Sequence, residues 1–295
     1  MIELVIEERQ KDLGGFHVGR ILPFPKRRMV GPFIFLDHMG PLDLAPNVPR
    51  GMDVRPHPHI GLSTVTYLFA GEMTHRDSVG VTMDIRPGEV NWMTAGRGIT
   101  HSERFDGLRQ NGGHLHGLQA WVALPKEAEE TDPRFDHYGL SDLPSFSDTG
   151  VTGRLIAGTA YGNRSKVVTH SPLFYVHFEL QAGATVDVPS GYAERAAYIV
   201  RGTIAVDGQR HEKGHMLVFG KGDAAISAVT DATVAILGGD PVGERFIEWN
   251  FVSSSKERLE QAKADWRAGR FKLPDADNKE FIPLPEPAPP PNPMS

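Results

Sequence analysis

The sequence predicts an all-β fold made of two similar β-barrels and followed by a C-terminal helix. Short runs of β-branched and aromatic residues alternate with turns, and 32 Gly and 23 Pro among 295 residues supply those turns. The two halves of the chain repeat one pattern, which indicates duplication of a single barrel unit. Near the C-terminus the apolar residues change to helical spacing.

The first half contains four expected strands. They are residues 63–69, 79–85, 90–93 and 118–124. Gly71 follows the first run, Pro87-Gly88 the second and Pro125 the last, so residues that end strands bound these runs. Short strands at this spacing along the sequence are typical of a barrel or sandwich and not of βαβ units.

The second half repeats the arrangement after a connector. Residues 125–150 are rich in Pro, Asp, Ser and Glu and are expected to be that connector. The expected strands that follow are residues 173–180, 196–200, 203–206, 216–219 and 233–237. Residues 66–71 align with 197–202, and 87–90 align with 213–216. We therefore expect units over residues 1–130 and 131–250, and a terminal region over 251–295.

The terminal region is expected to hold one helix and a proline-rich tail. Ser254 and Glu257 have the spacing of a capping box at a helix start. An apolar stripe follows at helical spacing, formed by Leu259, Ala262 and Trp266. Gly269 ends the helix, which is expected to pack Trp266 onto a barrel. From Pro283 onward we expect an extended chain that is mobile at its end.

Composition excludes several classes of protein. The chain has no cysteine, which rules out disulfides, thiolate metal sites and thiol nucleophiles. A formal net charge of -6 argues against a nucleic-acid partner, because neutralising phosphates needs a concentrated basic surface. No apolar stretch approaches the roughly 20 residues of a membrane span. Residues 1–8 are acidic and alternating, unlike a signal peptide, so we expect a cytoplasmic protein without a membrane partner.

Two short pairs of side chains are suited to binding a metal. They are His57-Pro58-His59 and His101-Ser102-Glu103. On a strand, residues i and i+2 face the same way, so each pair can aim at one point. Three imidazoles and one carboxylate suit iron, nickel, manganese, copper or zinc, and they leave coordination positions open for a substrate or dioxygen. The sequence therefore predicts one metal site with nitrogen and oxygen ligands.

The repeat provides an internal control for this site. In the second half, the same offsets place Val188 and Ser190 where the first pair stands, and Ser227 and Val229 where the second pair stands. None of these four residues is a histidine or a carboxylate. We therefore expect the metal site in the first half only.

Four segments of the chain closely resemble the pirin family, a branch of the cupin superfamily. They are residues 32–38, residues 56–59 continuing to 67–68, residues 92–103, and residues 116–122 with 124–125. The resemblance covers residues 10–250 and implies a bicupin, which is two jelly-roll barrels with one metal ion, usually iron, in the first. The ligands that it implies are His57, His59, His101 and Glu103. Many other cupins place a glutamate ligand where this chain has Ser63 and Thr64, so here Glu103 has to supply the carboxylate.

The resemblance also implies an activity and partners. Pirins are associated with quercetin 2,3-dioxygenase activity, in which a flavonol and dioxygen react, the ring opens and carbon monoxide leaves. Fe(II) is then the expected metal, with Zn, Mn, Ni and Cu as alternatives, and Glu103 is the expected catalytic base. The alternative that the family offers is an iron-dependent redox sensor acting on a protein partner. An enzyme for another small oxygenated metabolite is a third possibility.

Other polar residues have weaker claims to the site. His114-Leu115-His116 repeats the His-x-His spacing and is the rival ligand pair. Alternatively, His116 and Gln119 contact the substrate in the same cavity. His75 and His137 stand in polar, loop-like surroundings and are expected to be solvated. His177 is expected to be a hydrogen-bonded strand residue.

Overall fold

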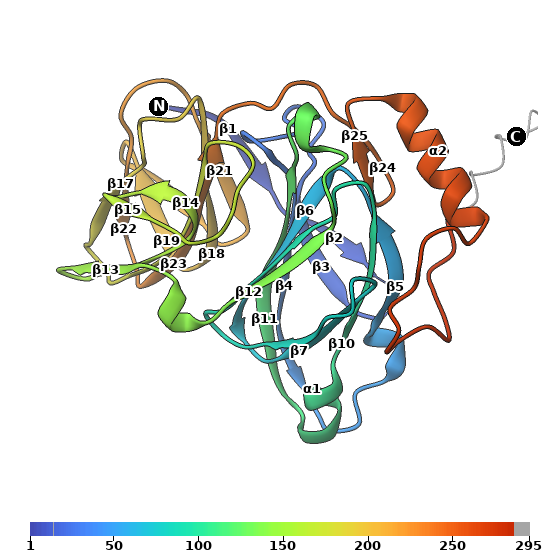
Figure 1. Ribbon diagram of the computed structural model, residues 1–295. Helices are drawn as coiled ribbons and strands as arrows, with labels where there is room; N and C mark the ends of the chain where they lie inside the picture. Colours follow the sequence, from blue (N-terminus) through green and yellow to red (C-terminus); the bar gives the residue numbers. More distant parts are fainter. Residues whose placement is uncertain (14, 286–295) are drawn as a thin grey trace, which may run out of the picture.

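Two β-barrels pack against each other, and the C-terminal region returns to the outer side of the first barrel (Figure 1). The computed structural model describes residues 1–13 and 15–285. Each barrel consists of one large and one small antiparallel sheet. The predicted all-β bicupin architecture with a C-terminal helix is confirmed.

The first barrel carries the histidine pairs. Its large sheet has the order β12 (Arg134–Tyr138), β9 (Val90–Thr94), β6 (Leu62–Ala70), β11 (Gly113–Ala123), β4 (Phe33–Leu44), β3 (His17–Leu22) and β2 (Arg9–Asp12). Its small sheet has the order β5 (Val54–His59), β10 (Ile99–Arg104), β7 (Met73–Asp77) and β8 (Thr82–Ile85). Both histidine pairs therefore lie on neighbouring strands of the small sheet.

The second barrel repeats this plan. Its large sheet has the order β1 (Ile2–Glu7), β21 (His215–Phe219), β18 (Glu194–Arg201), β23 (Ala232–Gly239), β16 (Leu173–Leu180), β14 (Val151–Ala160) and β13 (Ser145–Asp148), and β15 (Asn163–Arg164) pairs with β14. Its small sheet has the order β17 (Thr185–Asp187), β22 (Ala225–Ala228), β19 (Thr203–Val206) and β20 (Gln209–Glu212).

Two strands belong to the barrel on the other side of the expected boundary at residue 130. β1, at the start of the chain, pairs with β21 in the second barrel, whereas β12 pairs with β9 in the first. The expected connector over residues 125–150 thus contains β12 and β13. These strands are short, polar and partly exposed, so their sequences lack the apolar alternation that marks a strand.

The two large sheets pack face to face through a shared apolar core. Residues buried there from the first barrel include Leu36, Tyr67, Trp92 and Leu118, and those from the second include Tyr175, Tyr198, Met216 and Leu237. The rings of Phe33 and Tyr175 meet edge to face across the interface, with centroids 5.6 Å apart. Aromatic contacts of this kind add to the free energy gained by burying apolar surface.

The C-terminal region forms a hairpin and a helix on the first barrel. The hairpin is β24 (Phe246–Glu248) with β25 (Phe251–Ser253), and the helix is α2 (Lys256–Arg267). The other helices are α1 (Asp106–Asn111) and the 3-10 turns η1 (Arg50–Met52), η2 (Lys126–Ala128) and η3 (Leu140–Asp142). No helix within the two described ranges is long and apolar enough to cross a membrane.

The predicted start of α2 was wrong by one residue, while the predicted stripe is confirmed. Ser255 is the N-cap and accepts a hydrogen bond from the backbone N–H of Arg258. Ser254 is unavailable as the cap because its hydroxyl and its backbone N–H both donate to Glu129. The apolar stripe is buried in a cluster with Ile60 and Phe251 and consists of Leu259, Ala262 and Trp266. The predicted tail falls mostly on residues 286–295, outside the described residues.

Candidate metal centre

The local sequence around the first histidine pair suits an edge strand. β5 is the edge of the small sheet, and Pro56 and Pro58, which lack an N–H, are tolerated there because one side of an edge strand needs no partner. His57 lies directly opposite His101 on β10, and the register shifts between His101 and Glu103. Such an irregularity is a β-bulge, which changes the direction of the side chains beside it. The pairing thus places the two segments side by side in the sheet.

Three imidazoles converge inside the first barrel. The ligand atoms of His57, His59 and His101 all lie within 4.8 Å of one another. The rings of His57 and His101 are 4.4 Å apart between centroids, and all three residues are buried. Within residues 1–13 and 15–285, this is the one group of three or more such side chains whose ligand atoms lie that close together. Both residues of the first pair and His101 of the second therefore surround one point, and their role as metal ligands stays a prediction.

The hydrogen bonds of these rings leave one nitrogen of each free for a metal. Nδ1 of His57 donates to the carbonyl of Arg55 at 2.9 Å, and Nδ1 of His59 donates to the carbonyl of Asn250 at 3.0 Å. The Nε2 atoms of both rings then carry lone pairs. Nε2 of His101 is buried and has no partner among the described residues. An unpaired buried nitrogen costs about 1–3 kcal/mol unless a ligand satisfies it.

Burial also keeps the three rings in the form that binds metals. Desolvation lowers the pKa of His57 to about 4 and lowers the pKa of His59 and of His101 well below the usual value. The rings are therefore neutral near pH 7, and a neutral imidazole offers its lone pair without first losing a proton. The residues present thus fit a divalent transition metal.

Glu103 lies beside the cluster but is not part of it. Its side chain lines the same cavity as the three histidines, and its carboxylate is absent from the group of convergent ligand atoms. No hydrogen bond or ion pair engages it among the described residues, and burial raises the pKa of this carboxyl to about 7. Its role as the fourth ligand stays a prediction.

The histidines open into a cavity of about 760 Å³ within the first barrel. The opposite wall comes from inward-facing residues of the large sheet. Apolar side chains cover much of the lining and include Phe16, Val18, Phe35, Met39, Met73 and Trp121. The volume falls in the range of small-molecule sites, which combine apolar walls with a few polar groups.

Stacked rings form one wall that begins at the histidine cluster. Trp121 meets His59 edge to face with centroids 4.9 Å apart, and it stacks on Phe35 at 4.1 Å with an interplanar angle of 13°. The guanidinium of Arg20 lies 4.5 Å from the centre of the Phe35 ring. Asp37 holds Arg20 in place by two hydrogen bonds of 2.9 and 2.8 Å. These contacts hold the rings of Phe35 and Trp121 rigidly in the cavity lining.

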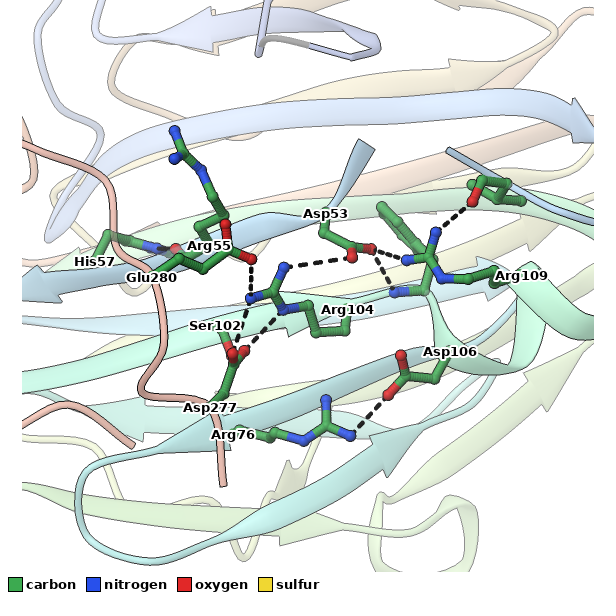
Figure 2. Close-up of polar contacts among 12 residues, drawn as sticks. Asp53, Arg55, His57, Arg76, Ser102, Arg104, Asp106, Arg109, Asp277 and Glu280 are labelled. Atoms are coloured by element: carbon green, nitrogen blue, oxygen red, sulfur yellow. Dashed lines mark hydrogen bonds and ion pairs between the residues drawn. The ribbon is translucent and has the colours of Figure 1, made fainter. Parts of the chain in front are cut away.

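The C-terminal segment after α2 contributes to the cavity lining, and Figure 2 shows two of its residues, Asp277 and Glu280, in contact with Arg104. Arg104, which is buried, donates to Asp277 at 2.7 and 2.9 Å and to Glu280 at 3.0 Å. The backbone N–H of Ile282 donates to the carbonyl of Pro56 on β5. Glu280 and Ile282 both line the cavity. Residues that lie far from the histidines in sequence thus complete the site.

The two predicted substrate contacts separate in the structure. Gln119 lines the cavity, and its Oε1 accepts a hydrogen bond from Thr66 at 2.8 Å. His116 is absent from the lining, so that prediction was wrong. Its Nε2 lies 2.8 Å from Nε2 of His38 and its ring meets Phe69, because it faces the interface between the barrels. The rival pair also fails to converge, since His114 is exposed beside Asp43.

His75 was wrongly predicted to be solvated. It lies on β7, next to β10 in the small sheet, and is 5% exposed. Its Nδ1 is 3.3 Å from Nδ1 of His101, and its Nε2 is 2.9 Å from Asp77. The sequence of β7 is polar and therefore does not resemble a buried strand. The only signal for it was the His-x-Asp alternation of residues 75–77.

Two other histidines belong to hydrogen-bond networks away from the cavity. His177 is confirmed as a hydrogen-bonded strand residue, since its ring nitrogens contact Tyr67 and Glu179. It is part of a His-x-Glu spacing in the second half, but this pair serves the interface. His137 is partly buried, and its Nδ1 donates to the side-chain oxygen of Asn91.

Comparisons with known proteins agree with this geometry. The family model Pirin matches residues 15–122, and the pirin C-terminal cupin domain matches residues 175–272. A pirin-like protein of Caulobacter vibrioides is 62% identical over 97% of this chain and 100% of its own length. A Pseudomonas aeruginosa protein provisionally named a quercetin 2,3-dioxygenase is 38% identical over 89% of this chain and 83% of its own length. The crystal structure of a quercetin 2,3-dioxygenase from Acinetobacter baumannii superposes with a TM-score of 0.87 at 31% identity, covering 98% of this chain and 96% of that one.

Proposed function

The chain belongs to the pirin family, and from this we propose that it is a metal-dependent dioxygenase acting on a flavonol such as quercetin. One observation carries the proposal: three neutral imidazoles with free Nε2 atoms face an apolar cavity that has a stacked aromatic wall. The names of the Pseudomonas and Acinetobacter relatives support the same reaction class.

We assign His57, His59 and His101 as the ligands of one iron ion and Glu103 as its anionic ligand. A mixed nitrogen and oxygen set is suited to non-haem Fe(II) and leaves positions for substrate. When bound, the metal supplies Lewis acidity toward the 3-hydroxyl of the flavonol and a site for dioxygen chemistry. Zn, Mn, Ni and Cu are alternative occupants of the same donors.

The protein's own residues position the substrate and receive its proton. Trp121 and Phe35, which stack on each other, form an apolar wall that contacts the flat rings of the substrate and holds the reacting hydroxyl toward the histidines. Gln119 uses its Oε1 to bind Thr66, so its amide N–H groups are free to face polar substituents. Glu103, on the cavity wall, takes the proton of the 3-hydroxyl as general base. The apolar lining excludes water from the opened ring.

The redox-sensor alternative stays a prediction. A sensor that acts on a protein partner needs a surface whose shape or charge changes with the oxidation state of the metal. It does not need a cavity of about 760 Å³ lined by aromatic rings. The cavity therefore favours the small-molecule account.

The test uses iron-loaded protein and quercetin in a closed cell with dioxygen and carbon monoxide detection. We expect quercetin and dioxygen to disappear in equal amounts and carbon monoxide to appear with them. Glu103→Ala is expected to lose activity by about 100-fold or more while keeping its metal, as is common for a general base. Glu72→Gln, a carboxylate paired with Arg86 outside the cavity, is the matched control. Unchanged turnover in Glu103→Ala would refute the base role.

A further inference from the structure

We propose that His75 and Asp77 form a positioning relay that fixes the proton of His101 on Nδ1, so that Nε2 faces the metal as a lone pair. The relay rests on the metal site proposed above and not on flavonol chemistry. Neither residue contacts the expected ion or the cavity, so both act through His101.

The relay is built into the small sheet of the first barrel. On β10 and β7, His101 lies opposite Asp77, and Glu103 lies opposite His75. Nδ1 of His101 is 3.3 Å from Nδ1 of His75, and Nε2 of His75 is 2.9 Å from Oδ2 of Asp77. The ring of Phe135 stacks on His75 with centroids 4.3 Å apart and an interplanar angle of 22°. All three members of the relay are at most 5% exposed, so water does not substitute for these contacts.

The direction of each hydrogen bond follows from the carboxylate at the end. Oδ1 of Asp77 accepts the backbone N–H groups of Val79 and Val81, both at 3.0 Å. Oδ2 is therefore left to accept from Nε2–H of His75, which places the lone pair of that ring on Nδ1. This lone pair accepts from Nδ1–H of His101. The remaining nitrogen of His101, Nε2, is the buried atom that has no partner among the described residues.

His101 differs in this respect from the other two expected ligands. His57 and His59 donate to backbone carbonyls, which can only accept and so fix the tautomer by themselves. The partner of His101 is another imidazole, which can either donate or accept. The tautomer of His101 therefore depends on Asp77, although Asp77 does not contact His101 and acts on it through His75. Partners of this kind orient a metal-binding histidine and increase its basicity.

Asp77→Asn is the sharpest variant because it keeps the shape and reverses the direction of the relay. The amide oxygen has to remain on the N–H groups of Val79 and Val81, so the amide nitrogen faces His75 as a donor. His75 then carries its proton on Nδ1 and faces His101 as a donor, which moves the proton of His101 to Nε2. We expect the affinity for Zn(II), measured by competition with a chromogenic chelator on the full chain, to fall by about 10- to 100-fold.

A matched control lies on the same hairpin. Asp84 of β8 accepts a hydrogen bond from the hydroxyl of Thr74 and takes no part in the relay. Asp84→Asn is expected to leave the Zn(II) affinity within about twofold of the wild-type protein. Equal affinities in Asp77→Asn and Asp84→Asn would overturn the relay.

Two substitutions of His75 test the same claim without changing the carboxylate. The side-chain oxygen of glutamine can accept from Nδ1–H of His101, whereas leucine cannot. His75→Gln is therefore expected to retain more Zn(II) affinity than His75→Leu, by about 10-fold. A purely structural role predicts that the two variants lose stability but bind Zn(II) equally, and that result would overturn the proposal.

The tautomer itself is visible by NMR of protein labelled with 15N at histidine. In the wild-type Zn(II)-loaded chain and after chelation, we expect His101 to carry its proton on Nδ1; after chelation of Asp77→Asn, we expect it on Nε2. An Nε2–H tautomer in the chelated wild-type protein would contradict the relay. These readouts do not involve turnover, so a failed quercetin assay with an intact relay would refute the proposed substrate alone.

Discussion

The two barrels share one strand plan but fill their interiors differently. In the small sheets, β5 and β10 of the first barrel are neighbours, as are β17 and β22 of the second. His57 lies opposite His101 in the first pair, whereas Val186 lies opposite Ile226 in the second. A buried apolar cluster fills the second barrel, and a cavity opens in the first. The fold therefore does not require the histidines, which indicates that they serve chemistry.

The difference also has an energetic side. Each buried polar atom without a partner costs about 1–3 kcal/mol, while apolar burial stabilises a barrel by roughly 25 cal/mol per Å². The second barrel uses its interior for stability, and the first gives up part of that stability for a polar site. Substitutions in the small sheet of the first barrel should therefore affect metal binding, whereas those in the small sheet of the second barrel should affect stability.

The largest effect is expected when a ligand is removed from the first barrel. His101→Ala should weaken metal binding by more than about 100-fold, because even the loss of a ligand's hydrogen-bond partner costs 10- to 100-fold. Elemental analysis of the purified variant checks this. The barrel itself should stay folded by circular dichroism. If His101→Ala retained a full complement of metal, the first barrel would not hold the metal through this histidine, and the proposed difference between the barrels would be wrong.

A substitution in the small sheet of the second barrel should affect stability instead. Ile226→Ala deletes a fully buried side chain and is expected to lower the free energy of unfolding by about 2–5 kcal/mol. Chemical denaturation measures this loss, and metal content per folded chain should not change. Ile226→Val, which removes a single methylene, is the graded control, with an expected loss of about 0.5–1.5 kcal/mol. Loss of metal in folded Ile226→Ala would show that metal binding in the first barrel depends on packing in the second.

A smaller effect is expected from added metal. A free ion at 100 times its dissociation constant should stabilise the folded chain by about 2.7 kcal/mol, since it binds the folded state alone. The melting temperature with and without excess Zn(II) measures this gain. His101→Ala should show no such shift. A shift of the same size in that variant would place the bound ion outside the three-histidine cluster.

The smallest effect concerns the aromatic wall. Trp121→Leu removes an aromatic ring from the cavity lining, and an aromatic contact with the substrate is worth about 0.5–1.5 kcal/mol beyond buried area, so quercetin should bind about 2- to 10-fold more weakly. Fluorescence titration of metal-loaded protein measures the change. Trp266→Leu, in α2 and outside the cavity lining, should leave quercetin binding unchanged. Equal weakening in both variants would argue against the wall.

The strands and the three clustered histidines were predictable because their signals are local. Residues 173–180 and 203–206 form β16 and β19 with the predicted bounds, since both are apolar strands of the second barrel. His57, His59 and His101 were singled out by the i, i+2 spacing of the two pairs together with the segments around them, which resemble the pirin family. Polar strands such as β7 escaped prediction because tertiary contacts, and not their own sequence, make them strands.

The rest of the site depends on contacts between distant parts of the chain. Arg104 and Asp277 meet although 173 residues separate them, and no local pattern announces that contact. The aromatic wall combines Phe35 of β4 with Trp121 of β11, which are paired across the large sheet. His116 was misplaced because sequence spacing does not show which face of β11 borders the second barrel.

Anomalous scattering from crystals of metal-loaded protein, collected on both sides of the metal absorption edge, is the most direct test of the metal centre. We expect one strong peak per chain, within bonding distance of Nε2 of His57, His59 and His101. A peak elsewhere, for example between His38 and His116, or no peak in protein with a full complement of metal, would contradict it.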